Sequence, residues 1–410
     1  MAARVGCHQG ISCSIPPTGP PEVAIQDIFL RTARHDLPLT SMRASPAIKN
    51  RNCILISVGL MKTNFLSIFT HGSLHRSRRW LLGTAFSALV TSLALPAHGA
   101  EQKLLNVSYD VTREFYKDYN EAFARHWKTK AGHDVLVDQS HGGSSKQARA
   151  VLDGLEADVV TFNQSTDLDI LVPTGLVAKD WVTKFPNNAA PYTSTILFLV
   201  RKGNPKGIKD WSDLVKEGVQ VIIPNPKTSG NGRYSYIGAW AFALQAPGGN
   251  EETAKKFVGK LFRNVPVLDT GGRGATTTFA QNGIGDVLLT FENEVHLTLR
   301  ELGADKFDIV VPSLSILAEA PVAVVEPVAK KHGTEAVAQE YLAHLYSEEG
   351  QELAAKHFYR PRSADVLKKH ASRFPEVKLV TIEEVAGGWR KVLEVHFREG
   401  GIFDQIYQQK

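Results

Sequence analysis

The stretch that decides the fold is DVLVDQSHGGSSKQARAVLDGL, residues 134–155. Its first five residues, 134–138, have the pattern of a β-strand. From Lys146 onward the apolar residues recur three and four positions apart, which places them on one side of a helix: Ala148, Val151, Leu152 and Leu155. A loop rich in glycine and serine, residues 139–146, lies between the two. A strand that passes through such a loop into a helix is the repeating unit of an α/β fold.

The same alternation continues along the chain after Leu104. Short apolar runs predict further strands at 104–110, 158–162, 195–200, 219–223, 286–290 and 322–325. Apolar residues at helical spacing predict helices at 112–127, 234–244, 257–262, 335–346 and 349–358. Strands that alternate with helices indicate mostly parallel sheets covered on both faces. The fold class is therefore α/β, and we expect the polar and aromatic chain after Phe374 to wrap the surface.

Composition separates the first hundred residues from the rest. The chain has 410 residues, and all three cysteines and all three methionines lie within residues 1–61. Residues 1–100 contain 10 basic and 3 acidic side chains, which leaves 37 basic and 39 acidic side chains in residues 101–410. A body without cysteine excludes cysteine nucleophiles, thiolate metal sites and disulfides. Its slightly negative net charge argues against a polyanion-binding surface, so no nucleic-acid partner is expected.

Residues 61–100 are interpreted as a secretory signal peptide. A basic segment begins at Met61, the run WLLGTAFSALVTSLALP at 80–96 is apolar and uncharged, and small residues follow it. This order is typical of a signal peptide with its cleavage site. A membrane anchor is the alternative, but the run is shorter than the roughly 20 residues that a spanning helix needs. Residues 1–60 are interpreted as an upstream extension or, alternatively, a disordered leader. We expect export to the periplasm.

Three glycine-rich loops each precede a predicted helix: residues 139–146, 225–232 and 269–276. The start of a helix offers unpaired N–H groups and a partial positive charge. Glycine lets the backbone approach a ligand, and serine and threonine add hydroxyl donors. One such loop has the alternative explanation of a helix cap or a tight turn. Three in one alternating chain favour a binding site for a small anion.

Other kinds of site find less support in the sequence. The loops lack the GxxxxGK[ST] and GxGxxG spacings of nucleotide-binding motifs. His141 has no second histidine or carboxylate at metal-binding spacing, so we interpret it as a turn residue and expect neither a metal nor a cofactor. Arg233 and Arg273 each lie at a loop. They could pair with the anion, or they could hold loop carbonyls or a nearby aspartate in place, which we favour slightly.

The loops and their flanks resemble the periplasmic sulfate- and thiosulfate-binding proteins of ABC importers. The segments that carry the resemblance are NVSYDVTREFYKDYNEAF (106–123), DQSHGGSSKQA (138–148), LVRKGNPK (199–206), PNPKTSGNGRY (224–234), DTGGRGATTTF (269–279) and YSEEGQELAAKHFYRPR (346–362). The resemblance implies a two-lobed, type II periplasmic-binding-protein fold with hinge strands between the lobes. Lobe 1 would comprise 101–196 plus 318–410, and lobe 2 would comprise 197–317. It also implies a monomeric receptor, not an enzyme, that delivers its anion to a membrane permease.

The resemblance also implies a set of anion-binding groups. The main-chain donors would be the N–H groups of Asp110, Ser144, Gly230, Asn231 and Gly272, joined by the hydroxyl of Ser229. Arg233 and Arg273 would lie behind them. Because sulfate carries no proton at neutral pH, the Asp110 carboxylate must turn away from it, and we expect it to cap the helix that begins at Thr112.

Two positions depart from the pattern of the sulfate binders. Asn231 stands where they usually have glycine, which preserves the N–H group. Phe291 stands where they place an indole donor, and phenylalanine cannot donate a hydrogen bond. Thiosulfate binders resemble this sequence at position 291 and in TFNQSTD, 161–167. Sulfate and thiosulfate therefore both stay open. The competing functions are a receptor for molybdate or phosphate and an exported ester hydrolase.

Overall fold

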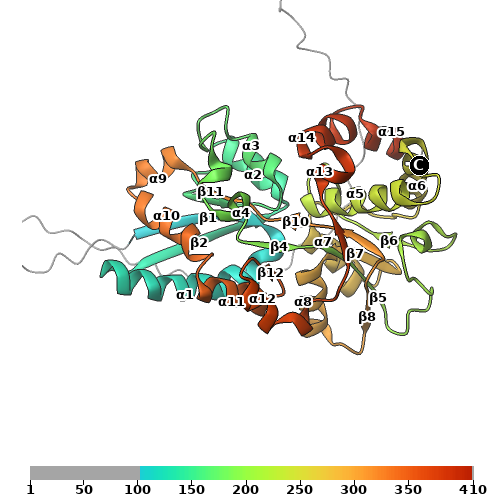
Figure 1. Cartoon of the computed structure of the whole chain (residues 1–410), viewed down its shortest axis with the longest axis horizontal. Coiled ribbons are helices and arrows are strands. Elements are labelled where there is room, and N and C mark those ends of the chain that lie inside the picture. Colours follow the sequence, from blue (N-terminus) through green and yellow to red (C-terminus); the bar gives the residue numbers. More distant parts are fainter. Residues whose placement is uncertain (1–101, 409–410) are drawn as a thin grey trace, which may run out of the picture. The chain divides into compact units, whose positions relative to one another are not determined.

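The computed structural model describes residues 102–408. The proposed leader and signal peptide lie outside this range. The helices and strands alternate as the sequence predicts, and every strand and helix predicted after Leu104 is present. The bounds agree within four residues, except that the helix predicted at 257–262 begins six residues earlier, at Glu251. The predicted α/β class is confirmed. Two sheets form the centres of two lobes, one with β1, β2 and β11 and the other with β5 to β8 (Figure 1).

The sheet of lobe 1 has the strand order β11-β3-β1-β2. Its strands are β1 (Gln102–Tyr109), β2 (Val135–Gly142), β3 (Val159–Thr161) and β11 (Val322–Val324). β1 pairs in parallel with β2 and β3, whereas β11 pairs antiparallel to β3. The carboxyl ends of β1, β2 and β3 therefore meet at one edge of the sheet, which is where ligands bind in open α/β sheets.

Helices cover this sheet because each presents an apolar stripe to it. In α1 (Arg113–Ala131) the aromatic residues Phe115, Tyr119 and Phe123 recur four apart and are fully buried. The helix ends at Gly132, whose φ of 77° is the left-handed conformation that favours glycine. The other helices of lobe 1 are α2 (Ser144–Leu152), α3 (Ser165–Asp169), α4 (Pro186–Ala189), α9 (Glu326–His332), α10 (Glu335–His344), α11 (Glu348–Lys356) and α12 (Ala364–Lys369).

The sheet of lobe 2 has the strand order β6-β7-β5-β8. Its strands are β5 (Ile196–Arg201), β6 (Val221–Ile222), β7 (Val287–Phe291) and β8 (Phe307–Val310). Only β6 and β7 are parallel, and β5 runs antiparallel to both of its neighbours. The expectation of a mostly parallel sheet is therefore wrong for this lobe. A continuous apolar run such as Ile196–Val200 reports that both faces of a strand are buried, and it does not report strand direction.

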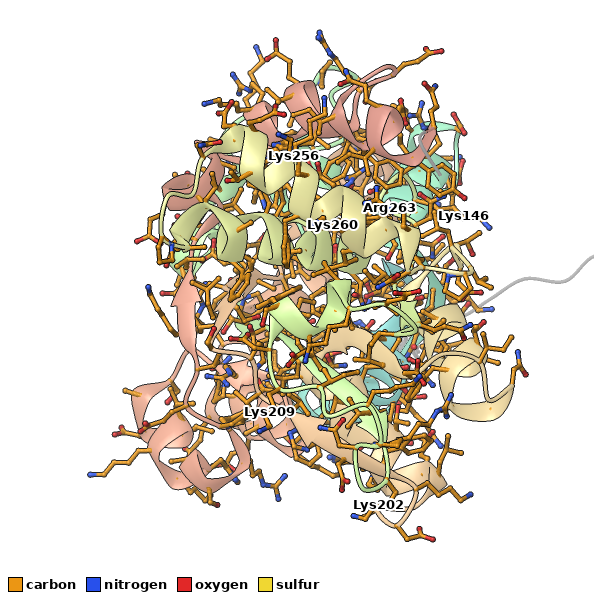
Figure 2. The ribbon with its side chains drawn as sticks, turned by 90° about the vertical axis from the view of Figure 1, so that its right-hand side faces the viewer. Lys146, Lys202, Lys209, Lys256, Lys260 and Arg263 are labelled. Atoms are coloured by element: carbon orange, nitrogen blue, oxygen red, sulfur yellow. The ribbon has the colours of Figure 1, made fainter. Side chains whose placement is uncertain are left out.

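The helices of lobe 2 include α5 (Gly230–Gln245), α6 (Glu251–Arg263), α7 (Gly272–Thr276) and α8 (Glu292–Leu302). α6 is amphipathic, because Ala254, Val258 and Leu261 face the core. Its exposed side carries a basic row that Figure 2 shows along the helix: Lys256, Lys260 and Arg263. No helix within residues 102–408 is long and apolar enough to cross a membrane.

Short strands join the lobes. β4 (Tyr192–Ser194) leads directly into β5, and β9 (Leu314–Ile316) leads through β10 (Ala318–Glu319) back to β11. The Ser315 hydroxyl joins β9 to β5. It donates to the Ile196 carbonyl at 2.8 Å and accepts from the Ile196 N–H at 3.2 Å. β12 (Arg360–Pro361) completes a small sheet in the order β10-β4-β12. These segments provide the hinge strands that the resemblance implies.

The end of the chain packs against lobe 2. After β13 (Lys378–Val380), which pairs with β9, come α13 (Ile382–Ala386), α14 (Trp389–Val392) and α15 (Ile402–Gln408). α15 lies beside α6 (Figure 1). Trp389 of α14 packs edge-on against Tyr234 of α5, and α14 also contacts α3 of lobe 1. The Tyr236 hydroxyl bonds to His396 at 3.0 Å, and Lys227 pairs with Asp404 at 2.8 Å. The assignment of all of 318–410 to lobe 1 does not fit these contacts, because buried aromatic groups attach the last segment to α5 and α6.

Candidate functional site

The three glycine-rich loops converge. The second and third loops are joined directly, since the Asn225 N–H donates to the Asp269 carbonyl at 2.7 Å. The first loop reaches them from lobe 1 at Gly143. A Cβ atom at Gly143 would lie 2.6 Å from the Thr228 carbonyl oxygen and 2.7 Å from that of Thr270. Only a residue without a side chain permits this approach, so the two lobes are in contact at the loops.

Lobe 1 contributes the start of α2. Ser144 is the first residue of this helix, so helix geometry leaves its N–H without an acceptor inside the helix. Its hydroxyl accepts a hydrogen bond from the Asn163 N–H at 3.3 Å. Both residues are buried, at 1% and 4% exposure. The main-chain donor that the sequence predicts at Ser144 is therefore at a buried helix start beside the loops of lobe 2.

Lobe 2 contributes the start of α5. Ser229 precedes the helix in extended conformation, and within the described part of the chain its side chain makes no capping bond to the helix. Gly230 and Asn231 are the first two helical residues, so their N–H groups have no acceptor inside the helix. The Asn231 side chain is used elsewhere, because its Nδ2 donates to Thr290 at 2.8 Å. A hydroxyl and two N–H groups are thus available together, as the sequence predicts.

The start of α7 lies against the start of α5. A Cβ atom at Gly272 would lie 2.9 Å from Asn231 Nδ2 and 3.1 Å from Val111 Cγ1, so a side chain at position 272 would crowd neighbours from both lobes. The N–H of the next residue, Arg273, donates to Asp110 Oδ2 at 2.9 Å. The first N–H of α7, on Gly272, belongs to the same group of helix-start donors.

The Asp110 side chain does not cap the helix after Thr112, so that expectation is wrong. Its carboxylate accepts from the Arg273 N–H at the start of α7, in the other lobe. Burial raises the pKa of Asp110, and the bond from the Arg273 N–H opposes this rise. The physical reason is that α7 offers an unpaired helix-start N–H directly opposite, while the Thr112 hydroxyl bonds to the Tyr109 carbonyl at 2.6 Å. The carboxylate is thereby occupied by a donor of the protein.

Phe291 closes one side of the group. It lies at the end of β7, is 2% exposed, and packs edge-on against Tyr109 of lobe 1 and Tyr234 of α5, with ring centroids 6.2 and 5.7 Å away. The Phe291 ring offers no hydrogen-bond donor.

The prediction that His141 is a turn residue is wrong, because His141 lies in β2 and pairs with Ser108 of β1. Its Nε2 lies 2.6 Å from Gln139 Oε1 and its Nδ1 3.1 Å from the Tyr109 carbonyl. Burial lowers the pKa of His141 to about 4, so its ring is neutral and structural.

The described residues 102–408 contain no group of three or more side chains that could hold a metal ion. Comparison with known proteins identifies the family. Residues 104–360 match the model of the bacterial extracellular solute-binding protein family.

The chain belongs to this family.

Several relatives of this solute-binding protein have names that state a ligand. It is 58% identical to the thiosulfate-binding protein of Pseudomonas aeruginosa over 324 residues, which is 78% of this chain and 97% of the relative. It is 55% identical to the sulfate-binding protein of Salmonella typhimurium, over 80% of this chain and 99% of the relative. Its structure matches that of the sulfate-binding protein SubI from Mycobacterium tuberculosis with a TM-score of 0.65 and 33% identity, over 71% of this chain and 98% of SubI.

The two arginines of this solute-binding protein are engaged by the protein itself. Arg233 is buried, donates to the Pro226 carbonyl at 2.8 Å, and has Asp167 at 3.8 Å. Arg273 forms a bidentate pair with Glu114 of α1 at 2.9 and 3.1 Å. It also lies 3.0 Å from Glu294. The favoured interpretation, that these arginines hold their surroundings in place, agrees with the contacts.

Sequence reasoning missed the partners of these arginines. Glu294 is 1% exposed, and burial raises its pKa to about 7 although Arg273 opposes the rise. Neither Glu114 nor Glu294 belongs to a motif, because each is an ordinary glutamate on a helix. No role was predicted for Asn163 or Asp167, although both lie in TFNQSTD, 161–167. This segment begins at the carboxyl end of β3, which lies at the same sheet edge as those of β1 and β2.

Proposed function

We propose that this chain is a periplasmic receptor that binds sulfate or thiosulfate and delivers it to the membrane permease of an ABC importer. The observation that carries the proposal is the set of neutral donors at Ser144, Ser229–Asn231 and Gly272, from loops of two lobes that touch. The names of the relatives support the same ligands.

The charges around these donors favour an anion that carries no proton. Arg233 and Arg273 are occupied by carbonyl and carboxylate groups, so neutral N–H and O–H groups remain for the ligand. Fixed dipoles at helix starts stabilise a buried anion without a full countercharge. The Asp110 Oδ2 atom accepts from the Arg273 N–H, so this oxygen is directed at α7. This set of neutral donors supports reversible binding of such an anion.

A calorimetric titration of the purified chain, residues 101–410, tests the proposal. Sulfate, thiosulfate, molybdate and phosphate should each be titrated at one ionic strength. We expect saturable binding of sulfate, thiosulfate or both, and no comparable binding of phosphate. Binding of molybdate or phosphate alone would assign the receptor to another oxyanion, and no binding of any of the four would reject the proposal.

Export and assembly form the second part of the proposal. We propose cleavage within residues 61–100, a mature chain that begins near Ala100 or Glu101, and a monomer in solution. The intact mass of the secreted protein tests the first statement, since retention of residues 61–95 would contradict it. Light scattering of the same sample tests the second.

A further inference from the structure

Asn163 is a buried amide with an unused hydrogen-bonding atom. It follows β3 in lobe 1 and is 4% exposed. Its side-chain oxygen has no hydrogen-bond partner among residues 102–408. Buried polar groups are almost always paired, and an unpaired one costs about 1–3 kcal/mol. A hydrogen-bond partner from outside the described residues would therefore stabilise this amide.

The amide points across the loops at the start of α5. A Cβ atom at Gly230 would lie 1.9 Å from Asn163 Oδ1, 2.7 Å from Cγ and 3.0 Å from Nδ2. The end of the side chain thus rests against the first residue of α5, in the other lobe. The main chain of Asn163 meanwhile donates to the Ser144 hydroxyl. Asn163 therefore lies between two of the helix-start donors, at Ser144 and Gly230.

We propose that Asn163 donates a side-chain N–H to the bound anion and is a further ligand-binding residue of the site. The inference rests on the proposed function. The nitrogen and oxygen of an asparagine amide are interchangeable in placement, and their assignment follows the hydrogen bonds around them. With a fully deprotonated anion at the start of α5, the NH₂ end faces the anion, because the oxygen would repel it. Asn163 then supplies a neutral side-chain donor to a site in which Phe291 supplies none.

The opposite orientation makes a different prediction. If the amide oxygen faced the ligand, the ligand would have to donate a proton to it. Hydrogen phosphate can do this at neutral pH, whereas sulfate and thiosulfate cannot. The identity of the preferred anion therefore reports which end of the Asn163 amide faces the site.

Calorimetry on Asn163→Ala and Asn163→Leu tests the proposal with sulfate, thiosulfate and phosphate. Loss of one hydrogen bond to a charged group should weaken the binding of sulfate or thiosulfate by about tenfold or more. Asn163→Leu keeps a branched side chain of somewhat larger volume and leaves no cavity, so a loss common to both variants is not caused by a cavity. Asn120→Ala is the matched control. It also removes a partly buried amide, which bonds to Val137 and Tyr341, in α1, and it should leave the affinity unchanged.

Asn163→Asp sharpens the result. A carboxylate beside the anion should weaken binding more than alanine does at pH 7, and part of the loss should be recovered as the pH falls, relative to the wild type at each pH. If the wild type binds sulfate or thiosulfate but Asn163→Ala and Asn163→Leu bind it equally well, the inference is wrong and the proposed function stands. Preference of the wild type for phosphate, or no binding at all, overturns both. Thermal unfolding of each variant confirms that it is folded before titration.

Discussion

The two lobes contribute different chemistry to the place where they meet. Lobe 2 presents donors: the hydroxyl of Ser229 and the helix-start N–H groups of α5 and α7. Lobe 1 presents a helix-start N–H at Ser144, but also two carboxylates that reach into lobe 2, from Asp110 to the Arg273 N–H and from Glu114 to the Arg273 guanidinium. In the proposed function, the groups that bind the anion therefore differ from the carboxylates that join the lobes.

This division follows from the charges. A carboxylate aimed at the anion would repel it, whereas a carboxylate aimed at Arg273 attracts the other lobe. Burial alone would lower the pKa of Arg273, but Glu294 and Glu114 raise it above its ordinary value, so its charge is secure in the closed arrangement. Variants can separate anion binding from contact between the lobes, and we expect the strongest loss of affinity where the loops approach most closely.

Gly143→Ala should prevent the lobes from closing. The new methyl group would meet the Thr228 and Thr270 carbonyl oxygens at 2.6 and 2.7 Å, and both belong to backbone that cannot move aside. The φ of −56° at Gly143 suits alanine, so the open protein should fold normally. Overpacking costs about 1–3 kcal/mol, so we expect anion affinity to fall by about 100-fold at the upper end of this range. Calorimetry measures the loss.

Gly142→Ala is the control for this variant. Its methyl group would lie 3.4 Å from Gln147, an ordinary contact with a flexible side chain. We expect wild-type affinity for it. Equal losses in the two variants would show that the loop tolerates no change, and that contact between the lobes is not the cause.

Ser229→Ala removes the Ser229 hydroxyl, one of the proposed anion donors of lobe 2, and leaves the contacts between the lobes intact. A hydrogen bond to a charged group contributes about 1.5–3 kcal/mol, so affinity should fall by about 10- to 100-fold. Since the side chain makes no capping bond, the unfolding temperature of the ligand-free protein should change little. Unchanged affinity would exclude the Ser229 hydroxyl from the site.

The sequence predicts the starts of α2 and α5 well because they are local features. A glycine-rich segment between a strand and a helix indicates a helix start with free N–H groups, and this holds for residues 139–146 and 225–232 without knowledge of the fold. The apolar stripe of α1, with Phe115, Tyr119 and Phe123, is equally local and is confirmed. Each depends only on residues a few positions apart.

The features that were not predicted depend on partners far away in the sequence. The Asp110 carboxylate finds its donor 163 positions later, and Glu114 pairs with Arg273 across 159 positions. Strand direction in lobe 2 depends on the route of the chain through the hinge. An apolar run such as Ile196–Val200 does not indicate this direction. Local patterns fix which groups are available, and long-range packing decides which of them meet.

Phe291→Trp tests whether the side chain at position 291 affects the selectivity between sulfate and thiosulfate. An indole N–H should favour sulfate, because the terminal sulfur of thiosulfate is a poorer acceptor than oxygen. One charge-assisted hydrogen bond, less some packing strain against Tyr109 and Tyr234, should change the sulfate-to-thiosulfate affinity ratio by about 5- to 30-fold. The ratio of the two Kd values measures it. A simple clash would weaken both anions together and leave the ratio unchanged.

Glu114→Gln should give the smallest effect, because it removes a charge that joins the lobes without touching the anion. The Glu114 and Arg273 side chains are 29% and 28% exposed, and exposed or half-exposed pairs contribute at most about 1 kcal/mol. We expect a two- to fivefold loss of affinity at low salt that shrinks as salt rises, since mobile ions screen the pair. Because the pair is partly exposed to solvent, the unfolding temperature of the ligand-free protein should change little. Glu349→Gln is the control, because its partner Arg125 belongs to the same lobe. Equal losses in the two variants would mean that general charge, and not the contact between lobes, sets the affinity.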